Sequence, residues 1–144
     1  MHRRLLCIVL LTILGSCADP QSPEEAVRSV ISRMEQAAEA RDVGDLVEHV
    51  SERYRDGYGY GREEVSHYVR GYFIANQSIH LLTRVEELDF PSEQEARATV
   101  RVGMVGRDAG AAAWDVAADV YRFKITLHRE DGEWKLTYAE WSRG

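Results

Sequence analysis

The strongest candidate for a catalytic residue in this sequence is Asp119, a carboxylate on a strand face that is predicted to be apolar. Asp119 is in phase with Tyr121 and with the alternating apolar residues Phe123, Ile125 and Leu127. Desolvation there would disfavour the charged carboxylate and raise its pKa toward the working range of a general base. The alternative, which we favour, is that Asp119 lies near a strand end and pairs with an arginine such as Arg84 or Arg101.

Tyrosines surround a glycine-rich segment in the first half of the chain. Tyr54, Tyr58 and Tyr60 cluster around Gly57, Gly59 and Gly61. Their rings and hydroxyls could rim the mouth of a pocket, with Tyr121 and Trp114 as further candidate ligand contacts. The alternative is plain aromatic packing in a connection between helices. The glycines do not predict a phosphate cradle, because they follow a predicted helix and fit neither nucleotide-binding spacing.

The sequence offers no metal-ligand or nucleophile motif. The histidines His49, His67, His80 and His128 are scattered without paired spacing, so we expect no metal site and no cofactor. Ser66 and His67 are neighbours on a predicted helix and therefore point apart. No serine stands in a Gly-x-Ser-x-Gly elbow, and hydrolase chemistry gains no support.

The N-terminus has the layout of an export signal. A basic head of His2, Arg3 and Arg4 precedes a ten-residue apolar run, Leu5–Leu14, about half of the ~20 residues that span a bilayer. This pattern indicates a signal peptide. Leu14-Gly15-Ser16-Cys17 resembles the lipobox of bacterial lipoproteins, which implies cleavage before Cys17 and a lipid on its sulfur. Ordinary secretion, with cleavage at Ser16-Cys17-Ala18, is the alternative.

The lipobox resemblance implies a location and a division of the chain. Residues 1–16 are then the lipoprotein signal peptide, 17–21 the lipidated tether, and 22–144 a single domain. Two or more acyl chains hold a protein stably on a membrane that it does not span. In lipoproteins an aspartate directly after the cysteine favours the inner membrane. Ala18 stands there instead, so we expect the outer membrane of the cell envelope, facing the periplasm.

Charge and cysteine content restrict the partners. Removing residues 1–16 leaves 128 residues, enough for one domain with a core. It also removes two of the 18 basic residues, leaving 16 against 24 acidic ones, a formal charge of −8. This acidic balance argues against binding nucleic acid. Cys7 leaves with the signal peptide and Cys17 carries the lipid, so no disulfide is expected.

Three helices are predicted in the first half of the domain. Ser22-Pro23-Glu24-Glu25 has the form of a capping box and opens a helix to about Arg41. Asp42 caps a second, shorter helix that carries Leu46, Val47 and Val50. A third helix begins near Arg62, and its apolar face carries Val65, Tyr68, Val69, Tyr72 and Phe73.

The second half changes to a period of two, which predicts strands at Ser78–Phe90, Glu95–Val105, Trp114–His128 and Glu133–Trp141. Asp131-Gly132 predicts a two-residue hairpin turn. Its register pairs Leu127 with Leu136, Ile125 with Tyr138, and Arg122 with Trp141, which could stack as a cation–π pair. The loop Gly110–Ala113 could be a flap over a pocket or a plain surface loop.

The predicted fold class is α+β, with three N-terminal helices packed on one curved antiparallel β-sheet. The order of elements resembles the nuclear transport factor 2-like superfamily, which includes SnoaL-like cyclases and ketosteroid isomerase. The resemblance rests on the capped first helix, the helix at Val43–Val50, Gly61-Arg62-Glu63-Glu64, and the ending Asp131-Gly132-Glu133-Trp134-Lys135-Leu136 with Trp141-Ser142. It implies a cone-like fold, an apolar pocket between sheet and helices, and a homodimer formed through the sheet.

Two functions remain open, because this superfamily contains both enzymes and binding modules. The first is a non-catalytic, lipid-anchored binding module for a small apolar ligand or an envelope protein partner. The alternative is a small cofactor-independent enzyme of isomerase, cyclase or hydratase type, with Asp119 as base and a nearby tyrosine as acid.

Overall fold

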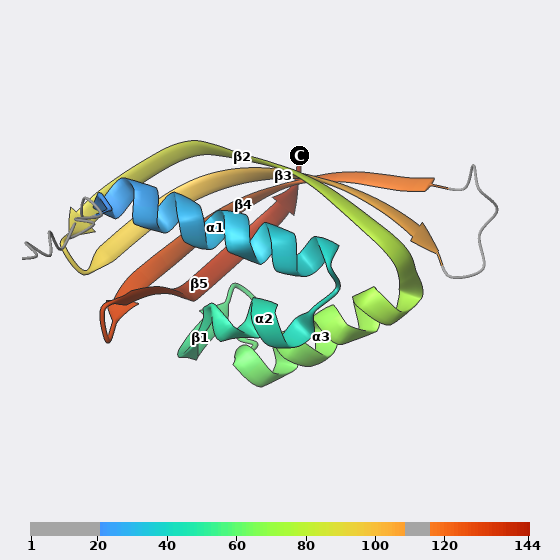
Figure 1. Ribbon diagram of the computed structural model, residues 1–144, viewed down its shortest axis with the longest axis horizontal. Helices are drawn as coiled ribbons and strands as arrows, with labels where there is room; N and C mark the ends of the chain where they lie inside the picture. Colours follow the sequence, from blue (N-terminus) through green and yellow to red (C-terminus); the bar gives the residue numbers. More distant parts are fainter. Residues whose placement is uncertain (1–20, 109–115) are drawn as a thin grey trace, which may run out of the picture.

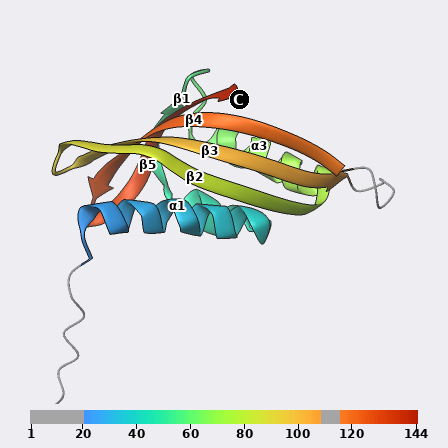
Figure 2. The same cartoon turned by 90° about the horizontal axis from the view of Figure 1, so that it is seen from above.

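The computed structural model describes residues 21–108 and 116–144, with side chains over 21–105 and 119–144. Over these residues the elements are α1 (Pro23–Glu39), α2 (Val43–Glu48), β1 (Val50–Asp56), α3 (Arg62–Ala75), β2 (Asn76–Ser92), β3 (Glu95–Asp108), β4 (Val116–Glu130) and β5 (Glu133–Arg143). The described strands form one curved sheet in the order β1-β5-β4-β3-β2. Helix α1 lies across its concave face, and α2 and α3 lie near the β1 edge (Figures 1 and 2). The α+β prediction is confirmed.

The prediction of the sheet was wrong at one edge. A fifth strand, β1, lies between α2 and α3 and pairs in parallel with β5, so the helices are not consecutive and the sheet is not wholly antiparallel. Helix α2 ends at Glu48, and Val50, expected in that helix, begins β1. Val50 and Tyr54 gain more apolar burial against β5 than a longer exposed helix would give them. A register shift between Val50 and Arg55 hides the period of two in the sequence.

Helix α1 supplies the helical side of the main core. Ser22 Oγ accepts a hydrogen bond from the Glu25 amide at 3.2 Å, and the Glu25 carboxylate accepts one from the Ser22 amide at 3.0 Å, which confirms the capping box. The predicted apolar face of α1 is buried against alternate residues of β3 and against Leu127 of β4. The buried members of this core are Val27, Val30, Ile31, Ala96, Ala98, Val100, Val102, Leu127 and Trp134. Burial of these side chains is the main stabilising term of the fold.

Helix α3 begins at Arg62 as predicted but packs less tightly than its pattern suggests. The Glu64 carboxylate accepts a hydrogen bond from the Gly61 amide at 2.9 Å, and backbone hydrogen bonds of this kind lower the pKa of Glu64. Phe73 is buried, whereas Tyr68, predicted on the same apolar face, is 72% exposed. The helix contacts β1, α2 and the start of β2 rather than lying across the sheet. No helix in the described ranges has the length and hydropathy needed to cross a bilayer.

The β4–β5 hairpin has the predicted turn but not the whole predicted register. Asp131 and Gly132 take positive φ angles of 50° and 82°, and Leu127 pairs with Leu136. A bulge at Thr137 then shifts every later pair by one residue. Thr137 Oγ1 lies 2.8 Å from His128 Nδ1 and donates to the Thr126 carbonyl at 3.2 Å.

The bulge makes two predicted pairings wrong. Ile125 faces Ala139 rather than Tyr138, and Trp141 faces Phe123 rather than Arg122. Arg122 instead forms an ion pair with Glu86 on the convex face at 3.3 Å. The sequence contains no turn signal at Thr137, so the hairpin rule alone could not find this extra residue.

The convex face of the sheet is open to solvent over the described residues. Glu86 bridges Arg101, at 2.8 Å, and Arg122. Leu82 and Val120 are 79% and 45% exposed and lie on either side of Gly103 in the register. The homodimer expected through this face stays a prediction.

Hydrogen bonds to Glu130 connect the edge strand β1 with β4. Glu130 Oε1 accepts hydrogen bonds from Ser51 Oγ at 2.8 Å and from the Arg53 guanidinium at 2.6 Å. The hydrogen bond from Arg53 is the main cause of a lowered pKa at Glu130, whose ordinary value is 4.5. The stability that this carboxylate contributes is therefore present above about pH 4.5 and is lost as the pH falls through the lowered folded-state pKa.

We predict that Glu130→Gln lowers the free energy of unfolding at pH 7 by no more than about 1 kcal/mol, since Arg53 is solvent-exposed. The difference from wild type shrinks below pH 4.5. Urea unfolding at pH 7, 5 and 3 measures it, with exposed Glu93→Gln as the control. A difference that grows in acid would contradict the assignment.

Candidate ligand-binding site

Five aromatic side chains from three separate segments form a continuous row at one end of the helix-covered sheet face. The ring centroids are 5.4 Å apart for Tyr58 and Trp141, 5.9 Å for Trp141 and Phe123, and 6.3 Å for Phe123 and Tyr121. Tyr60 joins the row through Tyr58, at 6.3 Å. These tilted and edge-on geometries are those that aromatic pairs prefer. We call these five residues the aromatic row.

The sheet register positions the inner part of the row. Phe123 of β4 and Trp141 of β5 are direct cross-strand partners, and Tyr121 lies two residues from Phe123 on the same face. Without the bulge at Thr137, Trp141 would oppose Arg122, whose side chain is on the convex face. The bulge therefore brings Trp141 into the row.

A buried carboxylate positions the outer part of the row. Asp56 is 4% exposed, and its Oδ1 accepts hydrogen bonds from the backbone amides of Tyr58, at 2.8 Å, and Tyr60, at 2.9 Å. The Asp56 amide donates to the Tyr60 carbonyl, and the Gly57 amide donates to the Ala139 carbonyl, each at 3.0 Å. These bonds fold residues 57–60 back onto β5. They hold Tyr58 beside Trp141.

The tyrosines predicted as a group divide between core and surface. Tyr58 and Tyr60 are 68% and 56% exposed, whereas Tyr54 is 2% exposed and packs with Val50 and Leu136. Burial, and then the charge of nearby Asp56, raise the pKa of the Tyr54 hydroxyl far above its usual range, so it stays protonated. Tyr54 therefore supports the site from the core and does not lie on its rim.

Asp119 lies at the end of the row, in an ion pair with Arg143. Its side chain is 33% exposed, and the pairing raises the pKa of the Arg143 guanidinium. An arginine partner was the favoured expectation, but neither Arg84 nor Arg101 is the one. Arg143 takes this place because β5 continues two residues beyond its predicted end at Trp141. The pair gives the aromatic row a polar end.

Other candidates lie outside the described residues or outside the row. Cys17, Trp114 and the Gly110–Ala113 loop are outside the described ranges. Within those ranges, no group of three or more His, Cys, Asp or Glu side chains is arranged to hold a metal ion. Sequence reasoning missed Phe123 and Trp141 as site residues. Phe123 could have been found, because it lies two residues from Tyr121 on the same predicted strand face. No signal of this kind was present for Trp141.

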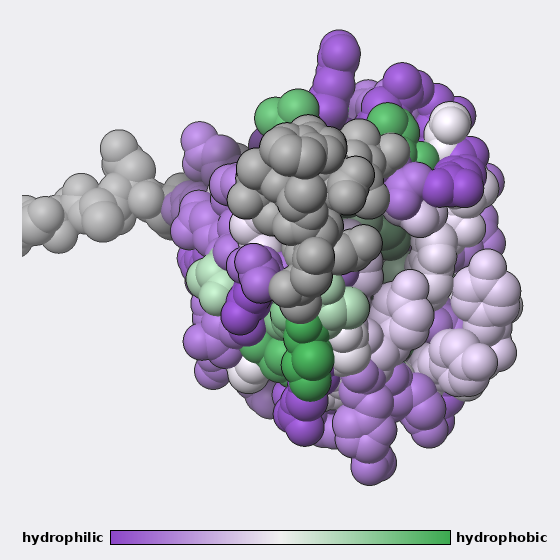
Figure 3. Space-filling model, turned by 90° about the vertical axis from the view of Figure 1, so that its right-hand side faces the viewer, coloured by the Kyte–Doolittle hydropathy of each residue, from purple (hydrophilic) through white to green (hydrophobic). Residues whose placement is uncertain are grey.

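The molecular surface at the end where α3 meets β2 is partly apolar. Figure 3 faces this end and shows green apolar side chains, paler side chains of intermediate hydropathy, and a recess among them. On α3, Tyr68 and Ile74 are 72% and 75% exposed. Single exposed apolar side chains are common on protein surfaces, so these two do not by themselves mark a binding site.

Several solved structures have the same architecture as this chain. A proposed scytalone dehydratase from Novosphingobium aromaticivorans superposes with a TM-score of 0.77 at 16% identity, over 84% of this chain and 83% of that one. A proposed dehydratase of the nuclear transport factor 2-like family from Streptomyces avermitilis gives 0.72 at 15%, over 87% and 99%. A hexachlorocyclohexane dehydrochlorinase gives 0.68 at 15%, over 84% of each chain.

The fold is the nuclear transport factor 2-like fold. This agrees with the superfamily resemblance of the sequence. No family model and no curated protein matches the sequence. At these identities the likeness shows the nuclear transport factor 2-like architecture alone, and the activity has to be argued from the residues of the site.

We predict that Asp56→Ala costs about 1–3 kcal/mol of unfolding free energy, because two backbone amides lose their acceptor. Asp56→Asn keeps one carbonyl oxygen for both amides and should cost less. Urea denaturation measures both, and amide hydrogen exchange at 57–60 reports whether the loop opens. Asp89→Ala, at an exposed position on β2, is the control and should stay within about 0.5 kcal/mol of wild type. Equal effects of Asp56→Ala and Asp89→Ala would show that the loop does not depend on this carboxylate.

Proposed function

We propose that this protein is a lipid-anchored binding module of the cell envelope and that its aromatic row takes a small apolar ligand. The observation that carries the proposal is the row itself, whose outer rings, Tyr58 and Tyr60, are solvent-exposed while their backbone is fixed by Asp56. Rigid aromatic side chains offer a large contact area at a low entropic cost. An envelope protein that inserts an apolar side chain at the same rings is the other partner compatible with it.

The polar end of the row restricts the ligand further. Asp119 and Arg143 neutralise each other, so they present hydrogen-bonding atoms without a net charge. We therefore expect an amphipathic or aromatic molecule with a polar group at one end. A flat hydrocarbon without such a group would leave the ion pair poorly solvated.

Binding of 8-anilinonaphthalene-1-sulfonate, a fluorescent aromatic probe with one anionic sulfonate, tests the row on the chain from Ala18 onward. The main core uses residues from Val27 onward, so this form retains it. We predict that Tyr58→Ala weakens binding about three- to tenfold, the usual worth of one aromatic contact. Tyr68→Ala is the matched control, since Tyr68 is also exposed but lies outside the row. Equal loss in both variants would place the binding surface elsewhere.

Membrane anchoring through Cys17 is a separate part of the proposal, supported by the lipobox-like Leu14-Gly15-Ser16-Cys17. We predict that the full-length protein incorporates a radiolabelled fatty acid and stays in the membrane fraction when produced in bacteria. Cys17→Ala abolishes the label, whereas Cys7→Ala keeps it. Label in the Cys17→Ala protein would contradict the assignment.

The enzyme alternative draws support from the structural neighbours, which include a proposed scytalone dehydratase and a hexachlorocyclohexane dehydrochlorinase. Within this chain it would use Asp119 as base, with Tyr121, two residues away on the same strand face, as the nearby acid. The ion pair with Arg143 opposes this role, because it already occupies a carboxylate oxygen that would have to accept the substrate's proton. Turnover of scytalone or of hexachlorocyclohexane that is lost in Asp119→Asn would replace the binding proposal with a catalytic one.

A further inference from the structure

The convex face of the sheet, on the opposite side from α1 (Figure 2), carries a row of three arginines. Arg84 of β2 is the direct cross-strand partner of Arg101 on β3, and Arg101 is in turn the partner of Arg122 on β4. Directly opposite residues on antiparallel strands point to the same face, where like charges repel one another. We call these three residues the arginine row.

A single carboxylate serves this row. A bulge in the β2–β3 register makes Glu86 an extra residue, and Glu86 forms ion pairs with Arg101 at 2.8 Å and with Arg122 at 3.3 Å. Among the residues whose side chains are described, Arg84 has no hydrogen-bond or ion-pair partner. Three guanidinium charges therefore face one carboxylate charge, and the row keeps an excess of positive charge.

The neighbouring charges on the convex face already have partners. Lys124 forms an ion pair with Glu140 at 3.4 Å, and the Glu87 carboxylate accepts a hydrogen bond from Thr99 Oγ1 at 3.2 Å. These groups neither neutralise the arginine row nor add to its positive charge.

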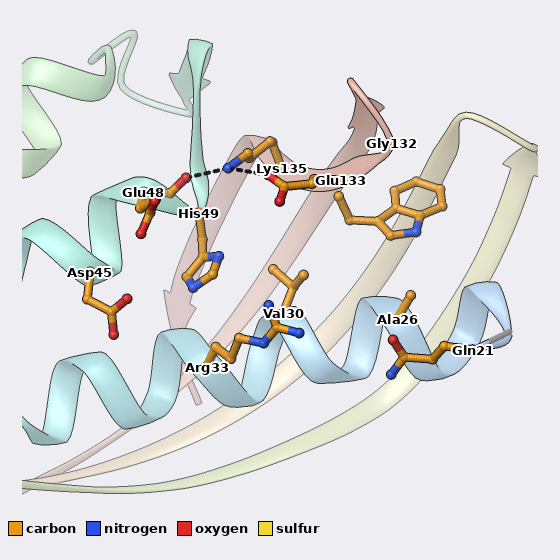
Figure 4. A pocket seen from close by; sticks show the side chains of 11 residues that line it. Gln21, Ala26, Val30, Arg33, Asp45, Glu48, His49, Gly132, Glu133 and Lys135 are labelled. Atoms are coloured by element: carbon orange, nitrogen blue, oxygen red, sulfur yellow. Dashed lines mark hydrogen bonds and ion pairs between the residues drawn. The ribbon is translucent and has the colours of Figure 1, made fainter. Parts of the chain in front are cut away.

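A groove of about 410 Å³ beside α1 shows no comparable excess of one charge. Its lining holds Arg33 and Lys135 among Asp45, Glu48 and Glu133 (Figure 4). Lys135 Nζ donates to the Glu48 carbonyl at 2.8 Å and pairs with the Glu133 carboxylate at 3.2 Å. Cations and anions alternate there, so the groove selects neither sign, whereas the arginine row selects an anion.

An apolar row runs beside the arginine row, two residues or about 7 Å along the strands. Its members Leu82, Gly103 and Val120 are cross-strand partners in that order. Leu82 and Val120 are 79% and 45% exposed, and the glycine between them has no side chain. Gly144 lies at the Val120 end, where its amide donates to the Val120 carbonyl at 2.8 Å. The gap over Gly103 can take an apolar side chain of a partner within reach of the arginines.

We propose that the convex face binds a short acidic segment of another protein, with one apolar side chain over Gly103 and its carboxylates on the arginine row. Guanidinium groups bind carboxylates through paired, charge-assisted hydrogen bonds. Arg84 is the main contact, because it has no partner within the described part of the chain. The proposal does not depend on the aromatic row, which lies on the other face of the sheet.

Two other occupants fit the charge pattern less well. A second copy in a two-fold interface presents the same patch, so one arginine row would lie against another. A long polyanion such as nucleic acid would extend beyond the row over a chain whose formal net charge is −6. A short acidic segment meets the basic part of the surface alone.

Fluorescence anisotropy of a labelled peptide tests this surface on the chain from Ala18 onward. The probe has nine residues, eight glutamates around one central phenylalanine. One comparison peptide has serine in place of the phenylalanine, and the other has glutamines in place of the glutamates. We expect each comparison peptide to bind roughly tenfold more weakly, because the first loses the apolar contact and the second loses the charges.

Two variants of the protein locate the contacts. Arg84→Gln should weaken binding of the phenylalanine peptide about three- to tenfold, and it breaks no internal ion pair. Gly103→Ala narrows the gap without strain, since the new β-carbon lies 3.7 Å from that of Leu82, and it should reduce the preference for phenylalanine over serine. Arg70→Gln and Gly71→Ala on α3, where a new β-carbon meets open space, are the matched controls and should change neither property.

Equal affinity for the three peptides, or equal losses in the control variants, would overturn the proposal. A homodimer in sedimentation velocity that Arg84→Gln or Gly103→Ala dissociates would also overturn it, in favour of a second copy on this face. Failure of 8-anilinonaphthalene-1-sulfonate binding would remove the proposed ligand site but leave the peptide result standing.

Discussion

The structure depends on the burial of one face of α1 in the concave face of the sheet. Val27, at 0% exposure, meets Ala96 and Leu127, which are also fully buried. Small alanines on β3 let the helix approach closely, and the larger side chains of α1 and β4 fill the space between them. Because α1 occupies this face, the rest of the concave surface is left to the aromatic residues in the first half of β4 and near the end of β5.

Two local irregularities then create the candidate site from an otherwise regular sheet. The bulge at Thr137 rotates Trp141 to the side of Phe123, and the buried Asp56 folds the glycine-rich segment so that Tyr58 reaches Trp141. Neither device contributes much apolar burial. Their effect is positional, which is the common role of bulges and of buried carboxylates near binding sites.

Two ion-pair groups on the described part of the sheet hold charged side chains in fixed places. Asp119 and Arg143 satisfy each other at the end of the aromatic row, and Glu86 is shared by Arg101 and Arg122 on the convex face.

The sequence by itself determined the elements that depend on local chemistry. Ser22 and Glu25 form the cap of α1, Asp131-Gly132 forms the hairpin turn, and the alternation along β3 places its apolar residues on one face. The order of these elements also indicated the nuclear transport factor 2-like fold. The cap, the turn and the alternation each follow from residues within a few positions of one another, which is why a single sequence is enough to predict them.

Only the tertiary structure decided the features that depend on distant partners. Strand β1 exists because Val50 and Tyr54 find an apolar partner in Leu136, and its irregular register leaves no period to read. Asp119 has Arg143 as its partner, and the aromatic row joins residues more than sixty positions apart. Pairings at such separations are set by packing of the whole sheet, and local sequence pattern does not contain them.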